Sequence, residues 1–133
     1  MKVLLALVAL WALSVPQNAL AKERSFVLPN GLRVTLVEAP DASRAAILVN
    51  VAAGSADERS DQRGIAHLAE HVFARGFNSG DRHALQAADL GGEEINAGTD
   101  FDRTNFYWTV PAQKLDQALA LEADRMRAAA DVV

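Results

Sequence analysis

Two short turns, each flanked by strand-like runs, constrain the fold of this chain most strongly. Pro29-Asn30-Gly31 joins residues 25–28 to residues 32–38, and Asn-Gly supplies the positive φ angles of a tight turn between strands. A polar turn joins residues 94–99 to residues 105–110 in the same way. Strands joined by turns this short run antiparallel, so the sequence predicts two hairpins.

One further strand and three helices complete the predicted elements. Residues 45–53, rich in Ile and Val, are long and apolar enough on both faces for a central strand. Helices are predicted over residues 64–75, over residues 82–90 and from Pro111 onward. Antiparallel strands combined with separate helices predict an α+β fold, in which an antiparallel-rich sheet carries helices packed on one face.

The helix ends are predicted from capping residues. Ser60 or Asp61 is suited to cap the first helix, which Gly76 would end, and Ser79 or Asp81 to cap the second, which Gly91-Gly92 would end. The last helix is expected to bury one apolar stripe, made of Leu115, Leu119, Ala123, Met126 and Ala130.

The first 21 residues have the pattern of a secretory signal peptide. Lys2 precedes a short apolar run, which ends in the small-residue site Ala19-Leu20-Ala21. We therefore expect residues 1–21 to be removed and the mature chain, residues 22–133, to begin at Lys22 in the periplasm or outside the cell. The run is too short to span a membrane, so no membrane span is expected after cleavage.

Composition excludes several classes of function. The chain has 13 Lys and Arg against 17 Asp and Glu, without a basic cluster, which argues against nucleic-acid binding. It has no cysteine, so disulfides and thiolate metal sites are excluded.

The strongest candidates for catalytic or metal-binding residues are His67, Glu70 and His71. On a helix their spacing places all three side chains within about 100° of arc, so they can address one atom. Two neutral imidazoles are good zinc ligands, and a carboxylate beside them can reach a water molecule at the metal. The alternative is a solvated helix face that merely contains two histidines.

The string from Gly64 to His71 is similar to the inverted zinc signature of the inverzincins, and the chain resembles the pitrilysin/insulinase family of zinc metallopeptidases. The resemblance extends from Phe26 to Met126. Other segments that carry it are residues 28–34, 51–55, 91–92, 96–99 and 104–107.

The resemblance implies a zinc-dependent endopeptidase that cleaves extended or unfolded peptides. It assigns His67 and His71 as zinc ligands and Glu70 as the general base. It also places Asn96 and Ala97 near the scissile bond, on a strand to which the peptide substrate adds as a further strand. The alternative for Asn96 is an asparagine that bonds its own backbone.

The resemblance leaves one ligand unassigned. The family's third ligand is a glutamate roughly 70 to 80 residues after the second histidine, whereas residues 72–133 alone follow His71. Glu93, Glu94 and His83 are local alternatives. The chain therefore resembles the N-terminal half of a larger two-layer peptidase domain, a fragment with a weak metal site and little activity alone.

Two classes of function stay open. The first is a zinc endopeptidase whose active-site chamber is closed by a homologous C-terminal domain or a partner subunit. The second is a non-catalytic interaction domain, or a silent subunit, of a peptidase complex.

Overall fold

The computed structural model describes residues 22–75 and 82–130, which belong to two compact units, Met1–Pro40 and Asp41–Val133. The described part of the first unit is the predicted hairpin of β1 (Glu23–Val27) and β2 (Arg33–Val37). Its turn is closed by a hydrogen bond from Gly31 N to Leu28 O (2.9 Å). Leu28 N also donates to Leu32 O (2.9 Å), so the connection is the predicted three-residue loop Pro29-Asn30-Gly31. Within this loop Gly31 alone has a positive φ, of 88°, whereas the Asn-Gly pair was expected to supply positive φ angles at both residues.

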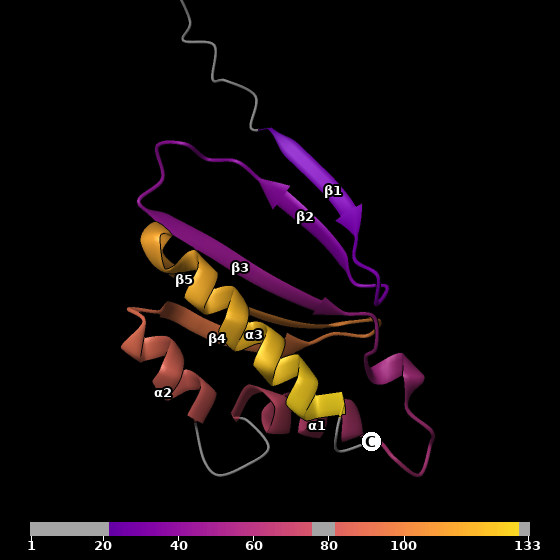
Figure 1. The fold of residues 1–133 in the computed structure, drawn as a ribbon. Helices are drawn as coiled ribbons and strands as arrows, with labels where there is room; N and C mark the ends of the chain where they lie inside the picture. Colours follow the sequence, from indigo (N-terminus) through magenta and orange to yellow (C-terminus); the bar gives the residue numbers. More distant parts are fainter. Residues whose placement is uncertain (1–21, 76–81, 131–133) are drawn as a thin grey trace, which may run out of the picture. The chain divides into compact units, whose positions relative to one another are not determined.

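The second unit contains a three-stranded antiparallel sheet and three α-helices (Figure 1). In chain order its elements are β3 (Arg44–Val51), the 3-10 turn η1 (Ser55–Asp57), α1 (Ile65–Arg75), α2 (Arg82–Asp89), β4 (Glu93–Thr99), β5 (Thr104–Pro111), the 3-10 turn η2 (Ala112–Lys114) and α3 (Leu115–Ala130). All predicted strands and helices are therefore present in the predicted order. The predicted caps Ser79 and Asp81 and the predicted stop at Gly76 lie outside the described residues.

The middle strand of this sheet is β5, and the strand order is β3-β5-β4. The prediction of a central position for residues 45–53 does not hold among the described strands, because β3 pairs with β5 alone. The apolar residues of β3 do not all lie in the core, because one face of the strand points outward and its Leu48 is 65% exposed. A run of apolar residues cannot by itself distinguish a central strand from an edge strand with an exposed apolar face.

The core lies between one face of the sheet and the helices. Along β5 every second side chain is buried, which places Phe106, Trp108 and Val110 on the same face. Ala87 of α2 and Ala118 of α3 pack against this face, and Phe73 of α1 contacts the Phe106 ring, with ring centroids 4.6 Å apart. The α+β architecture with helices on one face of an antiparallel sheet is thus confirmed.

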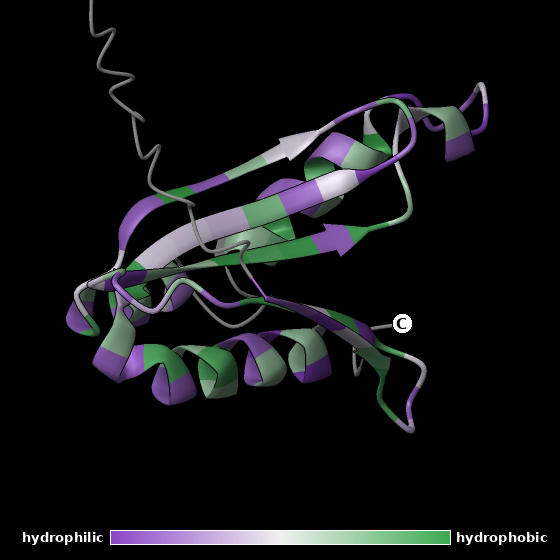
Figure 2. Ribbon diagram, turned by 90° about the horizontal axis from the view of Figure 1, so that it is seen from above, coloured by the Kyte–Doolittle hydropathy of each residue, from purple (hydrophilic) through white to green (hydrophobic). Residues whose placement is uncertain are grey.

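The buried stripe of α3 differs from the predicted one. Leu119 is 47% exposed, whereas Ala118, Glu122 and Arg125 are buried. Hydrophilic residues accordingly occur along the whole length of this helix (Figure 2). Leu115 of the predicted stripe is partly buried and packs against the core. The prediction was wrong for Leu119, because it assigned the buried face by apolar residues alone, and two charged residues lie inside.

Glu122 and Arg125 form the centre of a buried polar cluster. Glu122 accepts a hydrogen bond from Trp108 Nε1 (2.7 Å) and pairs with Arg125, and His83 Nε2 lies 3.2 Å from its Oε1. Burial alone would raise the pKa of Glu122, but the contacts from His83, Arg125 and Trp108 outweigh this effect and hold the pKa below its ordinary value. The carboxylate is therefore kept ionised inside the protein.

The Arg125 guanidinium extends this cluster to the first helix. Its central carbon lies 4.5 Å from the ring centroid of Phe73 and 4.8 Å from that of Phe106. These are cation–π distances, and they join α3, β5 and α1 around one charge.

The start of α1 is capped by a residue that the sequence did not indicate. Glu58 accepts hydrogen bonds from Gly64 N and Ala66 N, both at 2.9 Å. Asp61, one of the two predicted caps, instead pairs with Arg59 on the surface. These backbone hydrogen bonds lower the pKa of Glu58 below its ordinary value.

Gly54 fixes the loop that leads to this cap. A Cβ atom there would lie 2.5 Å from Asp100 O and 2.6 Å from Phe101 O. The two neighbouring residues, Ser55 and Ala56, donate their N–H groups to these same carbonyls. The close approach excludes any side chain at position 54 and attaches η1 to the turn between β4 and β5.

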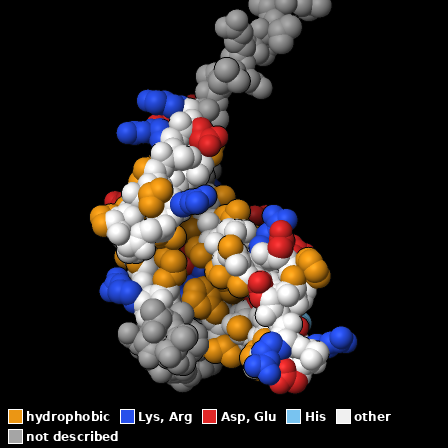
Figure 3. Space-filling model, turned by 90° about the vertical axis from the view of Figure 1, so that its right-hand side faces the viewer, with side chains coloured by type: hydrophobic (Ala, Val, Ile, Leu, Met, Phe, Trp, Pro, Cys, Tyr) orange, Lys and Arg blue, Asp and Glu red, His pale blue; other side chains and the backbone are white. Residues whose placement is uncertain are grey.

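Large hydrophobic side chains remain exposed on both units (Figure 3), among them Leu36 at 44% and Tyr107 at 42%. Among the described residues no helix is long and apolar enough to cross a membrane.

We predict that Glu122→Ala lowers the free energy of unfolding by about 3–5 kcal/mol, because it leaves Arg125 buried without its carboxylate. The matched control is Asp124→Ala. It breaks an exposed pair with Arg127 at the same i,i+3 spacing of the same helix, and it should cost at most about 1 kcal/mol. Urea unfolding followed by circular dichroism measures both, and equal small losses would contradict the role of the buried cluster.

The pH dependence of stability tests the Glu58 cap. The pKa of Glu58 is depressed in the folded state, so its contribution is fully present above the ordinary value of about 4.3 and is lost as the pH falls through the folded value. We expect Glu58→Ala to lower the urea midpoint at pH 7, with a difference from the parent that shrinks in acid. Asp61→Ala should change neither quantity, and a larger effect of Asp61→Ala would restore the cap expected from the sequence.

Candidate metal and catalytic site

The helix α1 brings the three residues of the H-x-x-E-H motif together, as their spacing predicts. The rings of His67 and His71 have centroids 4.6 Å apart and are tilted by 43°. Both histidines are exposed, whereas Glu70 is only 7% exposed. Two imidazoles thus lie side by side with access to solvent, and the carboxylate between them in sequence is turned toward the protein.

Glu70 is held by a single strong contact. Thr99 Oγ1, at the end of β4, donates a hydrogen bond to Glu70 Oε2 at 2.6 Å. Within the described residues, Oε1 accepts no hydrogen bond and no cation pairs with this carboxylate. One carboxylate oxygen is therefore fixed and the other is left for a solvent molecule.

A pocket of about 370 Å³ opens beside these groups. It is lined by Ser55, Glu58, Gly64, His67, Glu70, Ala97, Gly98 and Thr99. The pocket thus lies between the first turns of α1 and the end of β4, and Glu70 forms part of its wall.

A second pocket, of about 250 Å³, lies on the other side of Glu70. His71, Ala97 and the ring of Phe106 are among its walls, and His83 and Arg125 of the buried cluster also line it. Among the described buried atoms, Arg125 Nε has no hydrogen-bond partner. This pocket connects the candidate site with the interior of the unit.

The structure places both Ala97 and Asn96 at the pockets. Ala97 lines both of them, and Asn96 lines the second. Asn96 donates from Nδ2 to the Tyr107 hydroxyl (3.1 Å), and its Oδ1 accepts a hydrogen bond from Ala97 N (2.9 Å). Asn96 therefore makes the local backbone bond that was the alternative for it, and contact of either residue with substrate stays a prediction.

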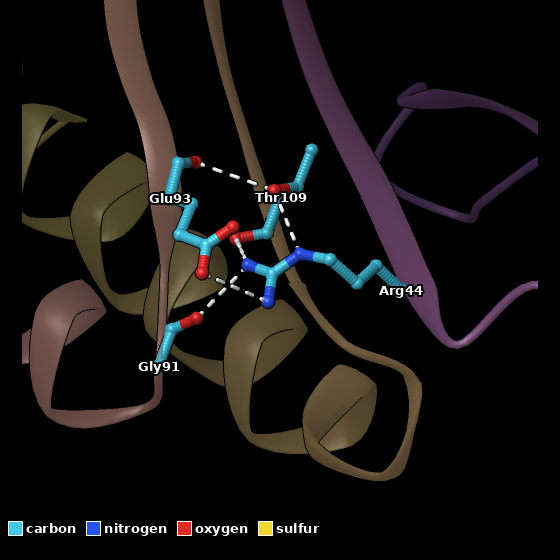
Figure 4. A network of polar contacts seen from close by, with 4 residues as sticks. All are labelled: Arg44, Gly91, Glu93 and Thr109. Carbon is cyan, nitrogen blue, oxygen red and sulfur yellow. Dashed lines mark hydrogen bonds and ion pairs between the residues drawn. The ribbon is translucent and has the colours of Figure 1, made fainter.

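The three local candidates for a third ligand do not join the histidines. Glu93 begins β4, at the end of the strand opposite to Thr99, and pairs with Arg44 at 3.4 Å. Arg44 also donates to the Thr109 hydroxyl (3.2 Å) and to Gly91 O (2.9 Å), as Figure 4 shows.

The other two candidates also lie apart. His83 faces Glu122, and Glu94 is an exposed residue with a positive φ of 54°. Over residues 22–75 and 82–130, no group of three or more His, Cys, Asp or Glu residues is placed to hold a metal ion.

Chemically, the arrangement offers two nitrogen donors for zinc, and zinc accepts imidazole readily. The donor set fits two ligands of a catalytic zinc site, with the third still to be supplied. The carboxylate of Glu70 differs from these two donors, because it is buried and accepts a hydrogen bond from Thr99.

Sequence reasoning missed the role of Thr99. Thr99 belongs to the segment 96–99 that carries part of the family resemblance, but no role was predicted for it from the sequence. One feature of the sequence could have indicated this contact: Thr99 is the last residue before the β4–β5 turn, where the end of the strand approaches α1. Glu58 was missed because its side chain reaches six and eight residues along the chain to the helix start.

Comparison with known proteins shows the family of this chain. Residues 33–130 match the family model described as Insulinase (Peptidase family M16). The chain is 38% identical over 107 residues to the coenzyme PQQ synthesis protein F of Pseudomonas aeruginosa, which covers 79% of this chain and 14% of that protein. It is also 38% identical over 124 residues to an uncharacterised zinc protease of Mycobacterium bovis, which covers 89% of this chain and 28% of the relative.

Among solved structures, pitrilysin superposes with a TM-score of 0.72 at 29% identity, over 82% of this chain and 12% of pitrilysin. The chain thus spans less than a third of the length of these relatives. With the family model matched over most of its length and the H-x-x-E-H motif on α1, the chain belongs to the insulinase family of metallopeptidases, peptidase family M16.

Proposed function

We propose that this chain supplies the metal-binding helix and the general base of a zinc endopeptidase that cleaves extended or unfolded peptides. The proposal rests mainly on the placement of His67, Glu70 and His71 on one helix beside β4, a strand that lies at the edge of the sheet formed by the described residues. Family membership supports peptidase chemistry, and the geometry supports the division of roles among the three side chains.

His67 and His71 hold the zinc ion in this proposal. Their exposure and proximity suit neutral imidazole donors, and the third donor comes from a part of the enzyme beyond this chain. Bound zinc would supply a Lewis acid that polarises a carbonyl group and lowers the pKa of a water molecule.

Glu70 is the general base. It accepts a proton from the attacking water and returns it to the leaving amine nitrogen. Its low exposure and its fixed Oε2 keep the carboxylate in one position, which favours proton transfer at a defined point.

The peptide substrate adds to β4. This strand pairs with β5 on one side, and its other edge has no strand partner in the part of the chain that the structure describes. An added strand is bound through its backbone, which explains acceptance of many sequences. Asn96 and Ala97 lie in the middle of this edge, where the peptide would first displace the bond from Ala97 N to Asn96.

The complete active-site chamber needs a partner. The relatives are several times longer than the matched region, so a homologous C-terminal domain or a partner subunit is proposed to cover the site and provide the third ligand. A non-catalytic interaction domain is the second candidate.

Replacing the base and a ligand separates the two roles. In the enzyme completed by its C-terminal portion, Glu70→Gln should keep zinc and peptide binding but lose turnover by a factor on the order of 10² or more. His71→Ala should lose zinc and activity together. Peptide hydrolysis and zinc content by atomic absorption measure this, with the exposed Glu38→Gln as control.

Full activity of Glu70→Gln would show that the base lies elsewhere. Loss of zinc from this variant would make Glu70 a ligand. A completed enzyme without activity, although it binds zinc, would favour the non-catalytic candidate.

The proposal includes export of the protein. Residues 1–21 lie outside the described residues, and the support is their pattern of Lys2, an apolar run and Ala19-Leu20-Ala21. Mass spectrometry of the protein from its native host should find an N-terminus at Lys22. Recovery of chains that start at Met1 from the cytoplasmic fraction would contradict export.

A further inference from the structure

We infer that Thr99 is a positioning residue for the general base and that its hydroxyl determines which oxygen of Glu70 faces the reacting water. The inference rests on the proposed role of Glu70 and extends it to a second residue on a different element. The main evidence is the hydrogen bond of 2.6 Å from Thr99 Oγ1 to Glu70 Oε2.

The geometry of the carboxylate makes this contact decisive. A carboxylate at the end of a glutamate side chain turns easily about its last bond, so its two oxygens exchange unless one is fixed. Here Oε2 is fixed, whereas no described residue donates to Oε1. Glu70, Thr99 and the ligand candidate His67 line the same pocket, so Oε1 is the oxygen left for water near His67.

The hydroxyl itself is well fixed. Thr99 is the last residue of β4 and pairs in register with Thr104 of β5. Thr104 is buried, and its own hydroxyl donates to Ala53 O at 2.9 Å. Branching at Cβ also restricts the rotamers of threonine. The base on α1 is therefore anchored to the sheet and not to its own helix.

This anchor has a consequence for substrate recognition. The strand that fixes Glu70 is the one to which the peptide is proposed to add. Movement of β4 on peptide binding is therefore transmitted to the base through one hydrogen bond. Thr99 links the register of the bound peptide to the position of the proton acceptor without touching the reacting atoms.

Two variants test this role in the enzyme completed by its C-terminal portion. Thr99→Val keeps the shape and removes the hydroxyl, and it should lower kcat by about 10- to 100-fold, the scale of a hydrogen bond to a charged group. KM and zinc content should stay within about two-fold of the parent, because neither ligand nor strand edge is altered. Thr99→Ser keeps the hydroxyl and should restore most of kcat.

A second readout does not depend on activity. The side-chain carboxyl ¹³C resonance of Glu70, assigned in the same protein by Glu70→Gln, should move in Thr99→Val and stay near its parent position in Thr99→Ser. Thr35→Val, which removes an exposed threonine hydroxyl from the hairpin, is the matched control and should change neither kcat nor this resonance.

The outcomes distinguish this inference from the proposed function. An inactive Glu70→Gln together with a fully active Thr99→Val would overturn the role of Thr99 alone. A fully active Glu70→Gln would overturn the proposed base. A loss in Thr99→Ser equal to that in Thr99→Val would also overturn the inference, because the hydroxyl would then not be the determining group.

Discussion

The carboxylate of Glu122 lies inside the second unit, and the packing of all three helices depends on how its charge is balanced. Trp108 of β5 donates to it, Arg125 pairs with it one helical turn away, and His83 of α2 lies beside it. The Arg125 guanidinium in turn contacts Phe73, two residues after His71 on α1. The orientation of the candidate metal helix is therefore set partly by an ion pair on another helix.

The two buried glutamates, Glu122 and Glu70, differ in how their charges are matched by neighbouring groups. Glu122 is surrounded by donors, and its charge is matched by Arg125. Glu70 has one hydroxyl donor and, among the described residues, no cationic partner. A carboxylate whose charge is matched by several groups is a poor proton acceptor, whereas one that keeps a free oxygen beside a pocket is suited to accept a proton.

The local pattern of the sequence was sufficient for the elements and for the common face of His67, Glu70 and His71, because turns and helical spacing are short-range properties. Asn30-Gly31 predicted the hairpin, and the spacing of His67, Glu70 and His71 predicted their common face. The sequence was not sufficient where distant segments determine the result. The buried face of α3 depends on His83 and Trp108, and the bond from Thr99 to Glu70 depends on the register of β4 against β5.

The position of β3 shows the same limit, since a run of apolar residues does not reveal whether a second strand lies beside it. The helix cap shows it too, because Glu58 reaches the start of α1 across a loop that Gly54 holds against the β4–β5 turn. In both cases the structure depends on contacts between segments that are far apart in the sequence, and the periodic pattern of a single segment does not predict such contacts.

The central claim is that His67 and His71 bind zinc while Glu70 stays outside its coordination shell. X-ray absorption at the zinc edge of the metal-loaded protein tests it most directly. We expect two imidazole nitrogens at about 2.0 Å, the loss of bound zinc in His67→Ala, and an unchanged spectrum in Glu70→Gln. A shell without imidazole, or one that changes when Glu70 becomes glutamine, would contradict it.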